Sequence, residues 1–233
     1  MADSRLLQAP LNRMSTAEQV ADALRERLLQ GQFLPGSRLP EDDIAATMQV
    51  SRNSVREGLQ ILVSEGLVRR SLHRGAIVSE LDTDELSDVY QARRIIEIAS
   101  LRAGMTGRDQ WVDSIVRALE DMEAAGAADN RPALLEADRS FHEGIVAGSH
   151  SQRIRRFYRN LQTEIRLTRT WQGERQPSPV FVARHKEVAD AIQAGDSQRA
   201  EELLKRIIDD GEDRVRKSLR GAPEVVGPVG DGR

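Results

Sequence analysis

The sequence predicts a mainly α-helical protein in two parts. The first is an N-terminal winged helix-turn-helix, which is three helices followed by a β-hairpin, and the second is an all-α helical bundle. Three observations predict this fold class. Apolar residues recur at helical spacing along most of the 233 residues. Two short strand-like runs lie close together near residue 70, with a glycine between them. From residue 82 onward the pattern is helical throughout.

The first part follows an N-terminal arm, residues 1–14, which shows no clear periodicity. Ser15 and Glu18 form a capping-box pattern, so a helix is expected to begin there and to end near Gly31. The sequence then predicts a second helix over 41–48 and a third helix from a Ser51 cap to Gly66. Strands are expected at 67–70 and 76–78, joined by a hairpin tip at 71–75. Together these elements form a domain over 15–80.

The second part is expected to be an all-helical domain over 83–220. Gly195 and Asp196 give a stop-and-restart signal before its last helix. Residues 221–233 contain four glycines and two prolines, which predicts a disordered tail. The six expected helices lie near 83–105, 108–126, 131–148, 151–174, 179–194 and 196–219.

Composition excludes several classes of protein. The chain has no cysteine, which excludes disulfide scaffolds, thiolate zinc sites and cysteine nucleophiles. Its formal net charge is −3, so the chain as a whole is not a basic nucleic-acid coat. No apolar run approaches the roughly 18 residues of a membrane helix, and the N-terminus lacks an apolar signal core. We therefore expect a cytoplasmic protein with no membrane partner.

The N-terminal end of the third helix carries side chains that suit DNA recognition. A helix fits the major groove, and residues at its N-terminal end reach base edges. Arginine can bind guanine, and asparagine can bind adenine, through two hydrogen bonds. Residues 51–75 hold five arginines and two acids, a local net charge of +3 that can attract phosphate. The candidate DNA-contacting residues of this helix are Ser51, Arg52, Asn53 and Arg56.

The hairpin tip supplies a second candidate contact with DNA. His73 and Arg74 would lie beside the phosphate backbone or the minor groove, and Gly75 would permit close approach. Arg69 and Arg70 fit a DNA role and a solvated strand edge about equally well.

The first part contains three characteristic motifs: GSRLPE at 36–41, VSRNSVREGL at 50–59 and RGAIV at 74–78. In these motifs it resembles the GntR family of bacterial transcription regulators. The likeness implies a homodimer that reads two half-sites of a double-stranded DNA operator. It also implies DNA contacts from Ser51, Arg52 and Arg56, with Gly75 in the wing.

The chain departs from the family pattern at several positions. Asn53 and Ser54 stand where Thr-Pro is usual, so the operator preference is expected to differ at Asn53. Gly58 stands where alanine is usual. Some members carry a DNA-contacting arginine early in the second helix, but this chain has Asp42 and Asp43 there, so no such contact is expected.

Three residues of the second part can form a metal site. Asp138 and His142 are four residues apart, so a helix would place them on one face. Such a pair can bind one metal ion through a carboxylate oxygen and an imidazole nitrogen. His185, from a later helix, could complete the site across a helical bundle. By spacing alone, an ordinary helix-surface pair explains Asp138 and His142 at least as well.

The second part contains VYQAR at 89–93, DRSFH at 138–142, RH at 184–185 and GD at 195–196. In these motifs it resembles the FCD ligand-binding domain of FadR-like GntR regulators. Such domains are helical bundles, and many bind a divalent metal through one Asp and three His, beside a pocket for a small organic acid. Asp138, His142 and His185 match three of these ligands, and Ile207 replaces the fourth. Three ligands and an open position still suit zinc, nickel or manganese.

Arg93 matches an arginine on the first helix of the FCD bundle. It can bind an effector carboxylate through two hydrogen bonds. It can equally form an internal ion pair with Glu97, four residues later. The sequence does not decide between these two roles.

Taken together, the sequence predicts a DNA-binding transcription regulator that acts as a homodimer and responds to a small carboxylate effector bound near a divalent metal. Ile207 supports an alternative, a regulator that has lost its metal. A second alternative is a metal-dependent enzyme fused to a DNA-binding module, in which the metal activates a water molecule. The chain has no His-Glu-x-x-His pattern and no nucleophile–base pair, so an enzyme is not expected.

Overall fold

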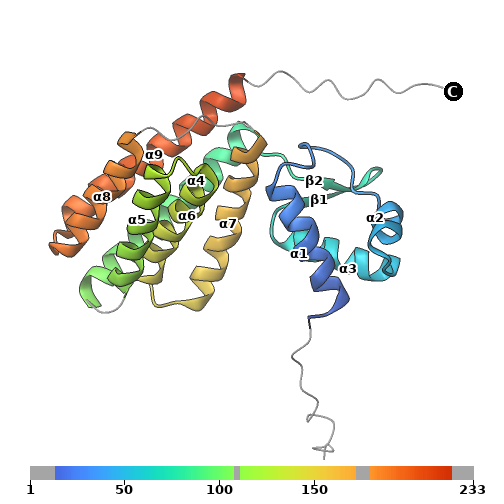
Figure 1. Ribbon diagram of the computed structural model, residues 1–233, viewed down its shortest axis with the longest axis horizontal. Helices are drawn as coiled ribbons and strands as arrows, with labels where there is room; N and C mark the ends of the chain where they lie inside the picture. The colour runs from blue at the N-terminus through green and yellow to red at the C-terminus, as the bar shows by residue number, and fades with distance from the viewer. Residues whose placement is uncertain (1–13, 108–110, 172–178, 222–233) are drawn as a thin grey trace, which may run out of the picture. The chain divides into compact units, whose positions relative to one another are not determined.

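The computed structural model describes residues 14–107, 111–171 and 179–221 (Figure 1). These residues form two compact units that divide between Glu80 and Leu81. The predicted arm over 1–14 and the predicted tail over 221–233 lie outside the described residues, except for Met14 and Gly221. Gly221 is the last residue of a helix.

The N-terminal unit contains helices α1 (Thr16–Leu29), α2 (Glu41–Met48) and α3 (Arg52–Ser64). The predicted capping box is present, because Ser15 and Glu18 exchange side-chain and backbone hydrogen bonds. Ser51 caps α3 by accepting a hydrogen bond from the backbone of Ser54 at 3.0 Å. Pro40 lies one residue before the first turn of α2 rather than within it. The aliphatic core of this unit comes chiefly from α1 and α3, through Val20, Leu24, Leu28, Val55, Leu59 and Leu62.

Gly58 allows α1 and α3 to pack closely. A Cβ atom at this position would lie 2.9 Å from the carbonyl oxygen of Ala17 and 2.9 Å from a methyl carbon of Val20. Alanine, the residue expected here from the family resemblance, would therefore force the two helices apart. This close packing supports α3 on α1.

The wing is an antiparallel hairpin of β1 (Val68–Ser71) and β2 (Gly75–Val78). Each strand includes one residue that the sequence places in the tip, because Ser71 pairs with Gly75. Gly75 has φ +72°, a conformation that glycine adopts without strain. A further bridge joins Arg38 to Ile77, and it ties the segment before α2 to the wing.

The second unit is an all-helical bundle. Over the described residues its helices are α4 (Thr83–Gly107), α5 (Trp111–Ala127), α6 (Arg131–Ala147), α7 (Gln152–Trp171), α8 (Pro179–Gln193) and α9 (Ser197–Gly221), and they match the predicted ones to within a few residues. The predicted helical residues 108–110 and 172–174 lie outside the described residues. Helix α9 packs on α4 and α8, and α6 packs on α4, α5 and α7.

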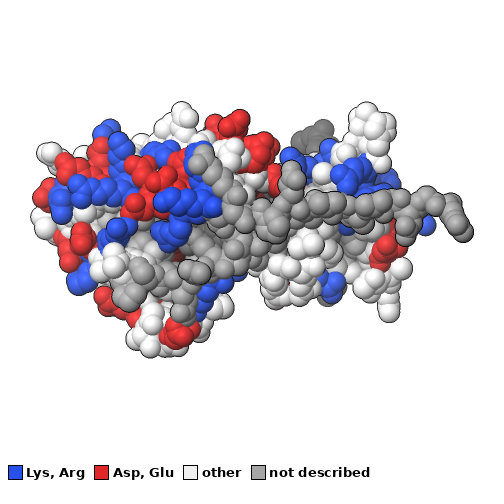
Figure 2. Space-filling view, turned by 90° about the horizontal axis from the view of Figure 1, so that it is seen from above, with Lys and Arg blue, Asp and Glu red and all other residues white. Residues whose placement is uncertain are grey.

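Cross-helix ion pairs cover the outside of this bundle. Arg102 of α4 binds Glu201 of α9 through two hydrogen bonds of 2.6 and 2.7 Å. Arg184 of α8 pairs with Asp210 of α9. Figure 2 shows the result, since basic and acidic side chains interleave over the bundle. Several of its arginines are thus balanced locally by neighbouring acids, which fits the small net charge of the chain. No helix among the residues described is both long and apolar enough to cross a membrane.

Candidate functional site

The candidate DNA-contacting residues of the third helix lie at its exposed N-terminal end. The side chains of Arg52 and Arg56 are 71% and 63% exposed, so both can reach a ligand in solvent. Asn53 is exposed and donates a hydrogen bond to Glu57 at 2.8 Å. Ser51 is also exposed, and its hydroxyl already caps the helix. The helix N-terminus and the two guanidinium groups thus lie on one exposed end of α3.

Both arginines have acidic partners on α2, which the sequence analysis did not predict. Nε of Arg52 lies 3.0 Å from Oδ1 of Asp42. A terminal nitrogen of Arg56 lies 3.2 Å from Oε2 of Glu41. Helix α2 packs against α3, and these pairs show that the acids at the start of α2 lie close to the start of α3. Only the packing of the two helices reveals these pairs.

The wing exposes the other candidate DNA-contacting residues. His73, Arg74 and Gly75 are all exposed at the tip of the hairpin. The backbone carbonyl of Arg74 accepts a hydrogen bond from Nε of Arg38 at 3.1 Å. This contact fixes the base of the tip while the Arg74 side chain stays exposed. We name the set Ser51, Arg52, Asn53, Arg56, His73, Arg74 and Gly75 the DNA-reading face.

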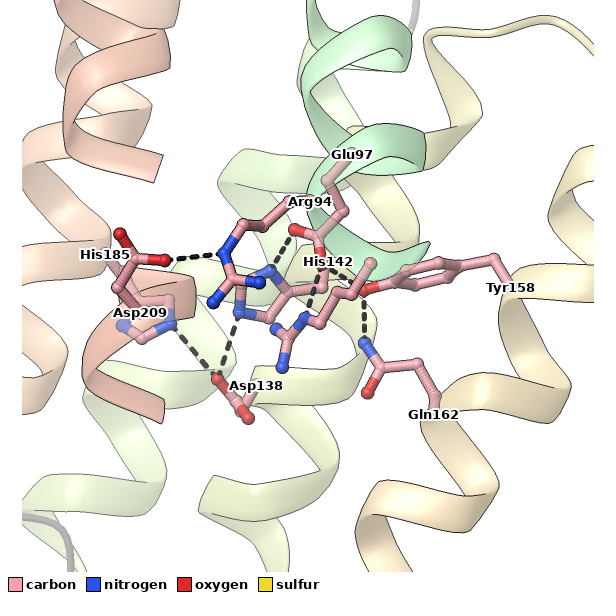
Figure 3. Close-up of polar contacts among 9 residues, drawn as sticks. Arg94, Glu97, Asp138, His142, Tyr158, Gln162, His185 and Asp209 are labelled. Atoms are coloured by element: carbon pink, nitrogen blue, oxygen red, sulfur yellow. Dashed lines mark hydrogen bonds and ion pairs between the residues drawn. The ribbon is translucent and has the colours of Figure 1, made fainter. Parts of the chain in front are cut away.

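The three predicted metal ligands come together inside the helical bundle. Asp138 and His142 lie on α6 and His185 lies on α8, and all three residues are buried. Oδ1 of Asp138 is 3.5 Å from Nε2 of His142 and 3.1 Å from Nε2 of His185. One ligand atom from each residue lies within 4.8 Å of the others. Figure 3 shows the two imidazoles converging on the carboxylate.

Hydrogen bonds assign the tautomer of each histidine. Nδ1 of His185 lies 2.8 Å from the carbonyl oxygen of Phe181, which can only accept, so Nδ1 carries the proton. Nδ1 of His142 lies 2.7 Å from Oε2 of Glu97, and it donates to that carboxylate. The Nε2 lone pairs of both rings therefore face Asp138. Nε2 of His185 is buried with no hydrogen-bond donor or acceptor at bonding geometry among the described residues.

This arrangement of acceptors suits a metal ion. Two imidazole lone pairs and a carboxylate repel one another unless a cation or a proton lies between them. Metal-binding histidines commonly donate their other ring N–H to a carboxylate or a carbonyl, as His142 and His185 do. The three residues therefore fit a divalent cation, bound by two nitrogens and one or two oxygens.

A second buried network surrounds His142. Glu97 of α4 is fully buried and accepts a hydrogen bond from Tyr158 at 2.6 Å. Gln162 in turn donates to the tyrosine oxygen at 2.6 Å. Burial alone would raise the pKa of Glu97, but Arg93 and His142 outweigh it and lower the pKa to about 2. Burial likewise disfavours the charged form of His142, yet Glu97 raises its pKa overall.

The structure places Arg93 in the internal pair that the sequence left open. Its Nε lies 2.5 Å from Oε1 of Glu97, and the residue is 4% exposed. Glu97 thus binds Arg93 and the candidate ligand His142 at once. From the sequence, Glu97 was expected only as a partner of Arg93. The i, i+4 spacing identifies that pair, whereas the contact of Glu97 with His142 and Tyr158 depends on how α4, α6 and α7 pack.

The position of the missing fourth ligand is apolar. Ile207 of α9 is 8% exposed and belongs to the hydrophobic core of the bundle. The nearby acids do not replace it, because Asp209 binds Arg94 at 2.7 Å and Asp210 pairs with Arg184. Helix α9 therefore supplies none of the three clustered ligands.

Comparison with known proteins decides the family. Residues 16–78 match the bacterial regulatory proteins of the gntR family, and residues 88–210 match the FCD domain, which alone covers more than half of the chain. The chain is a GntR-family transcriptional regulator with an FCD domain. The regulator thus carries a gntR-family DNA-binding domain followed by an FCD domain.

Individual relatives agree with this assignment. The gluconate operon transcriptional repressor of Bacillus licheniformis is 32% identical to the regulator, over 70% of this chain and 68% of its own. The galactonate operon transcriptional repressor of Escherichia coli is 27% identical, over 88% of this chain and 98% of its own. A solved GntR regulator from Rhodococcus is 31% identical, with a TM-score of 0.77, over 90% of this chain and 100% of that one. Because the families and relatives are transcriptional regulators, the regulator is not an enzyme.

Proposed function

We propose that the regulator binds operator DNA as a homodimer, and that its helical unit holds a divalent metal ion beside a site for a small organic acid. The observation that carries the metal is the convergence of Asp138, His142 and His185, with two imidazole lone pairs facing one carboxylate. Asp138 would supply oxygen, and the two histidines would supply their Nε2 atoms. The donor set suits zinc, nickel or manganese.

The metal and the effector belong together in this proposal. A metal with three protein ligands keeps open positions and acts as a Lewis acid toward a carboxylate or hydroxyl oxygen. Two relatives are named for the operons of gluconate and galactonate, which are hydroxy acids. We therefore assign the effector to small hydroxy-carboxylates. Arg93 already pairs with Glu97, which favours a structural role for it over direct contact with the effector.

On the DNA side, the proposal assigns operator contacts to the DNA-reading face. Arg52 and Arg56 would bind guanine edges or phosphate, and Asn53 an adenine or a phosphate. His73 and Arg74 would lie against the backbone, with Gly75 allowing the wing to approach. Two copies of this face would read two half-sites. An effector changes operator affinity only if it binds the DNA-competent and incompetent states unequally.

The test is fluorescence anisotropy with a duplex from the region upstream of the regulator's own gene, at moderate salt and with competitor DNA. Chelator-treated and zinc-loaded protein are compared with and without gluconate, galactonate and other hydroxy acids. We expect at least one acid to change operator affinity by about fivefold or more, and only with zinc. Asp138→Asn should abolish this response, whereas Glu120→Gln, an exposed change on α5, should keep it.

Several outcomes would contradict the proposal. If no complex with the duplex survived competitor DNA, the proposed operator contacts would be contradicted. An acid response of equal size in chelator-treated protein would contradict the role of the metal. No response to any acid of the panel would contradict the effector class. The homodimer would be contradicted if the regulator eluted from a sizing column as a monomer at micromolar concentration and also bound DNA as a monomer.

A metal-independent regulator is the second candidate, and Ile207 favours it. An apolar, buried side chain stands where related domains would place the fourth ligand. In that case the cluster would be held together by a proton shared between Asp138 and a histidine. Zinc would then leave the melting temperature unchanged, and the acid response would persist in the presence of chelator.

A further inference from the structure

The acidic start of α2 lies against three neighbouring arginines. Oδ1 of Asp42 is 3.0 Å from Nε of Arg52. The two carboxylate oxygens of Glu41 divide between Arg56, at 3.2 Å, and Arg70 of β1, at 2.8 Å. Two adjacent acids thus engage both arginines of the DNA-reading face that α3 supplies.

These ion pairs lie where DNA would dock. The side chains of Asp42 and Arg52 are 64% and 71% exposed, so this pair lies in solvent. Arg70 is the main cause that lowers the pKa of Glu41, although burial opposes it, so the Glu41 carboxylate is ionised at neutral pH. Exposed pairs of this kind are weak, and the arginines can exchange one anionic partner for another. A DNA phosphate that approaches Arg52 therefore competes with a carboxylate and is repelled by it.

Phosphate and base contacts respond differently to such competition. Non-specific binding comes almost entirely from neutralising phosphates, so it weakens when arginines are already neutralised. A guanine edge offers two acceptors in one plane and carries less charge than a phosphate. Arginine can bind that edge through two hydrogen bonds while a carboxylate stays beside it. A carboxylate next to the arginine thus penalises phosphate more than guanine.

We propose that Asp42, together with Glu41, is a specificity-determining residue: its carboxylate neutralises Arg52 in the free regulator and thereby suppresses non-specific binding to DNA. This inference rests on the proposed DNA contact of Arg52. It gives a function to acids at the start of α2, where they would otherwise only repel DNA. The adjacent Asp43 provides a matched comparison, because it is exposed and forms no ion pair within the described ranges.

The test uses the full-length regulator and two probes: a mixed-sequence duplex, and a duplex selected from a randomised pool by the wild-type regulator. Dissociation constants are measured by fluorescence anisotropy across a salt series for wild type, Asp42→Asn and Asp43→Asn. Both variants remove one negative charge from the same helical turn, so their difference isolates the pair with Arg52. Circular dichroism checks that both variants keep their helix content and melting temperature.

We expect Asp42→Asn to tighten binding to the mixed-sequence duplex about two- to fivefold more than Asp43→Asn does. The slope of log affinity against log salt should steepen by about 0.9, the contribution of one more phosphate contact. Affinity for the selected duplex should rise less, so the ratio of specific to mixed-sequence affinity should fall. On an Arg52→Ala background, Asp42→Asn should have no more effect than Asp43→Asn.

Equal effects of Asp42→Asn and Asp43→Asn on the mixed-sequence duplex would overturn the inference, and so would an unchanged affinity ratio. A failure of the proposed DNA contact looks different. In that case Arg52→Ala alone would leave the affinity for the selected duplex unchanged.

Discussion

Nε2 of His185 and Oδ1 of Asp138 lie 3.1 Å apart inside the helical bundle, although the Nδ1 proton of His185 is already donated to the carbonyl of Phe181. A lone pair of the imidazole therefore faces an acceptor of the carboxylate. His142 approaches the same oxygen from the other side of the cluster with its own Nε2. Two imidazole lone pairs and one carboxylate, with both rings fixed through their Nδ1 atoms, fit the cation site that we propose.

Removing the charge of Glu97 should destabilise the regulator strongly. Glu97→Gln would leave Arg93 buried without its counter-ion, and breaking one partner of a buried pair typically costs about 3–5 kcal/mol. Urea unfolding at neutral pH measures the change. Glu201→Gln is the matched control, because Glu201 pairs with Arg102 at the surface, where solvent screening leaves such pairs with little effect on stability. Equal losses in the two variants would contradict the buried network.

The arginines of α3 should dominate recognition of the operator. Arg52→Ala and Arg56→Ala should each weaken binding to the selected duplex by about 1–3 kcal/mol, the usual worth of a good bidentate base contact. Arg153→Ala, which removes an exposed arginine from α7, should have little effect. Anisotropy titrations at one fixed salt concentration make the comparison. If all three variants bind equally well, the DNA-reading face is wrongly placed.

Stability should depend on pH through Glu164. Burial, aided by Glu85, raises the pKa of Glu164 from its ordinary 4.5 to about 7. Because the folded pKa lies above the unfolded one, the contribution of the protonated form is complete below pH 4.5 and is lost as the pH rises through 7. Glu164→Gln should therefore raise the melting temperature at pH 8 and do so much less at pH 5. Glu120→Gln, at an exposed position, should show no such difference; a pH-independent effect of Glu164→Gln would refute this prediction.

Local patterns were enough to predict the helices and the hairpin. The spacing of apolar residues marks the buried face of each helix, and Ser15, Ser51 and the turn at Gly195 mark helix ends. The predicted helix bounds therefore differ from those in the structure by only a few residues. The strand limits shifted by one residue because cross-strand partners set them. The pairing of Arg38 with Ile77 joins segments far apart in sequence, and no local pattern signals it.

The functional residues divide in the same way. The spacing of Asp138 and His142 predicts that they share a helix face. The prediction that His185 joins them rested on the resemblance to a known domain. The sequence predicted only the pairing of Glu97 with Arg93, because the contact of Glu97 with His142 depends on how the helices pack. The pair between Asp42 and Arg52 was unforeseen for the same reason. Charge patterns along one helix predict contacts within it and not contacts between helices.

Isothermal titration of zinc into chelator-treated regulator tests the central claim, that Asp138, His142 and His185 bind a divalent metal. The variant Asp138→Asn, whose amide can donate a hydrogen bond to an imidazole nitrogen, is titrated beside the wild type. The account predicts saturable binding of about one ion per chain to the wild type and at least about tenfold weaker binding to the variant. Absence of saturable binding to the wild type, or equal affinity in the two proteins, would contradict it.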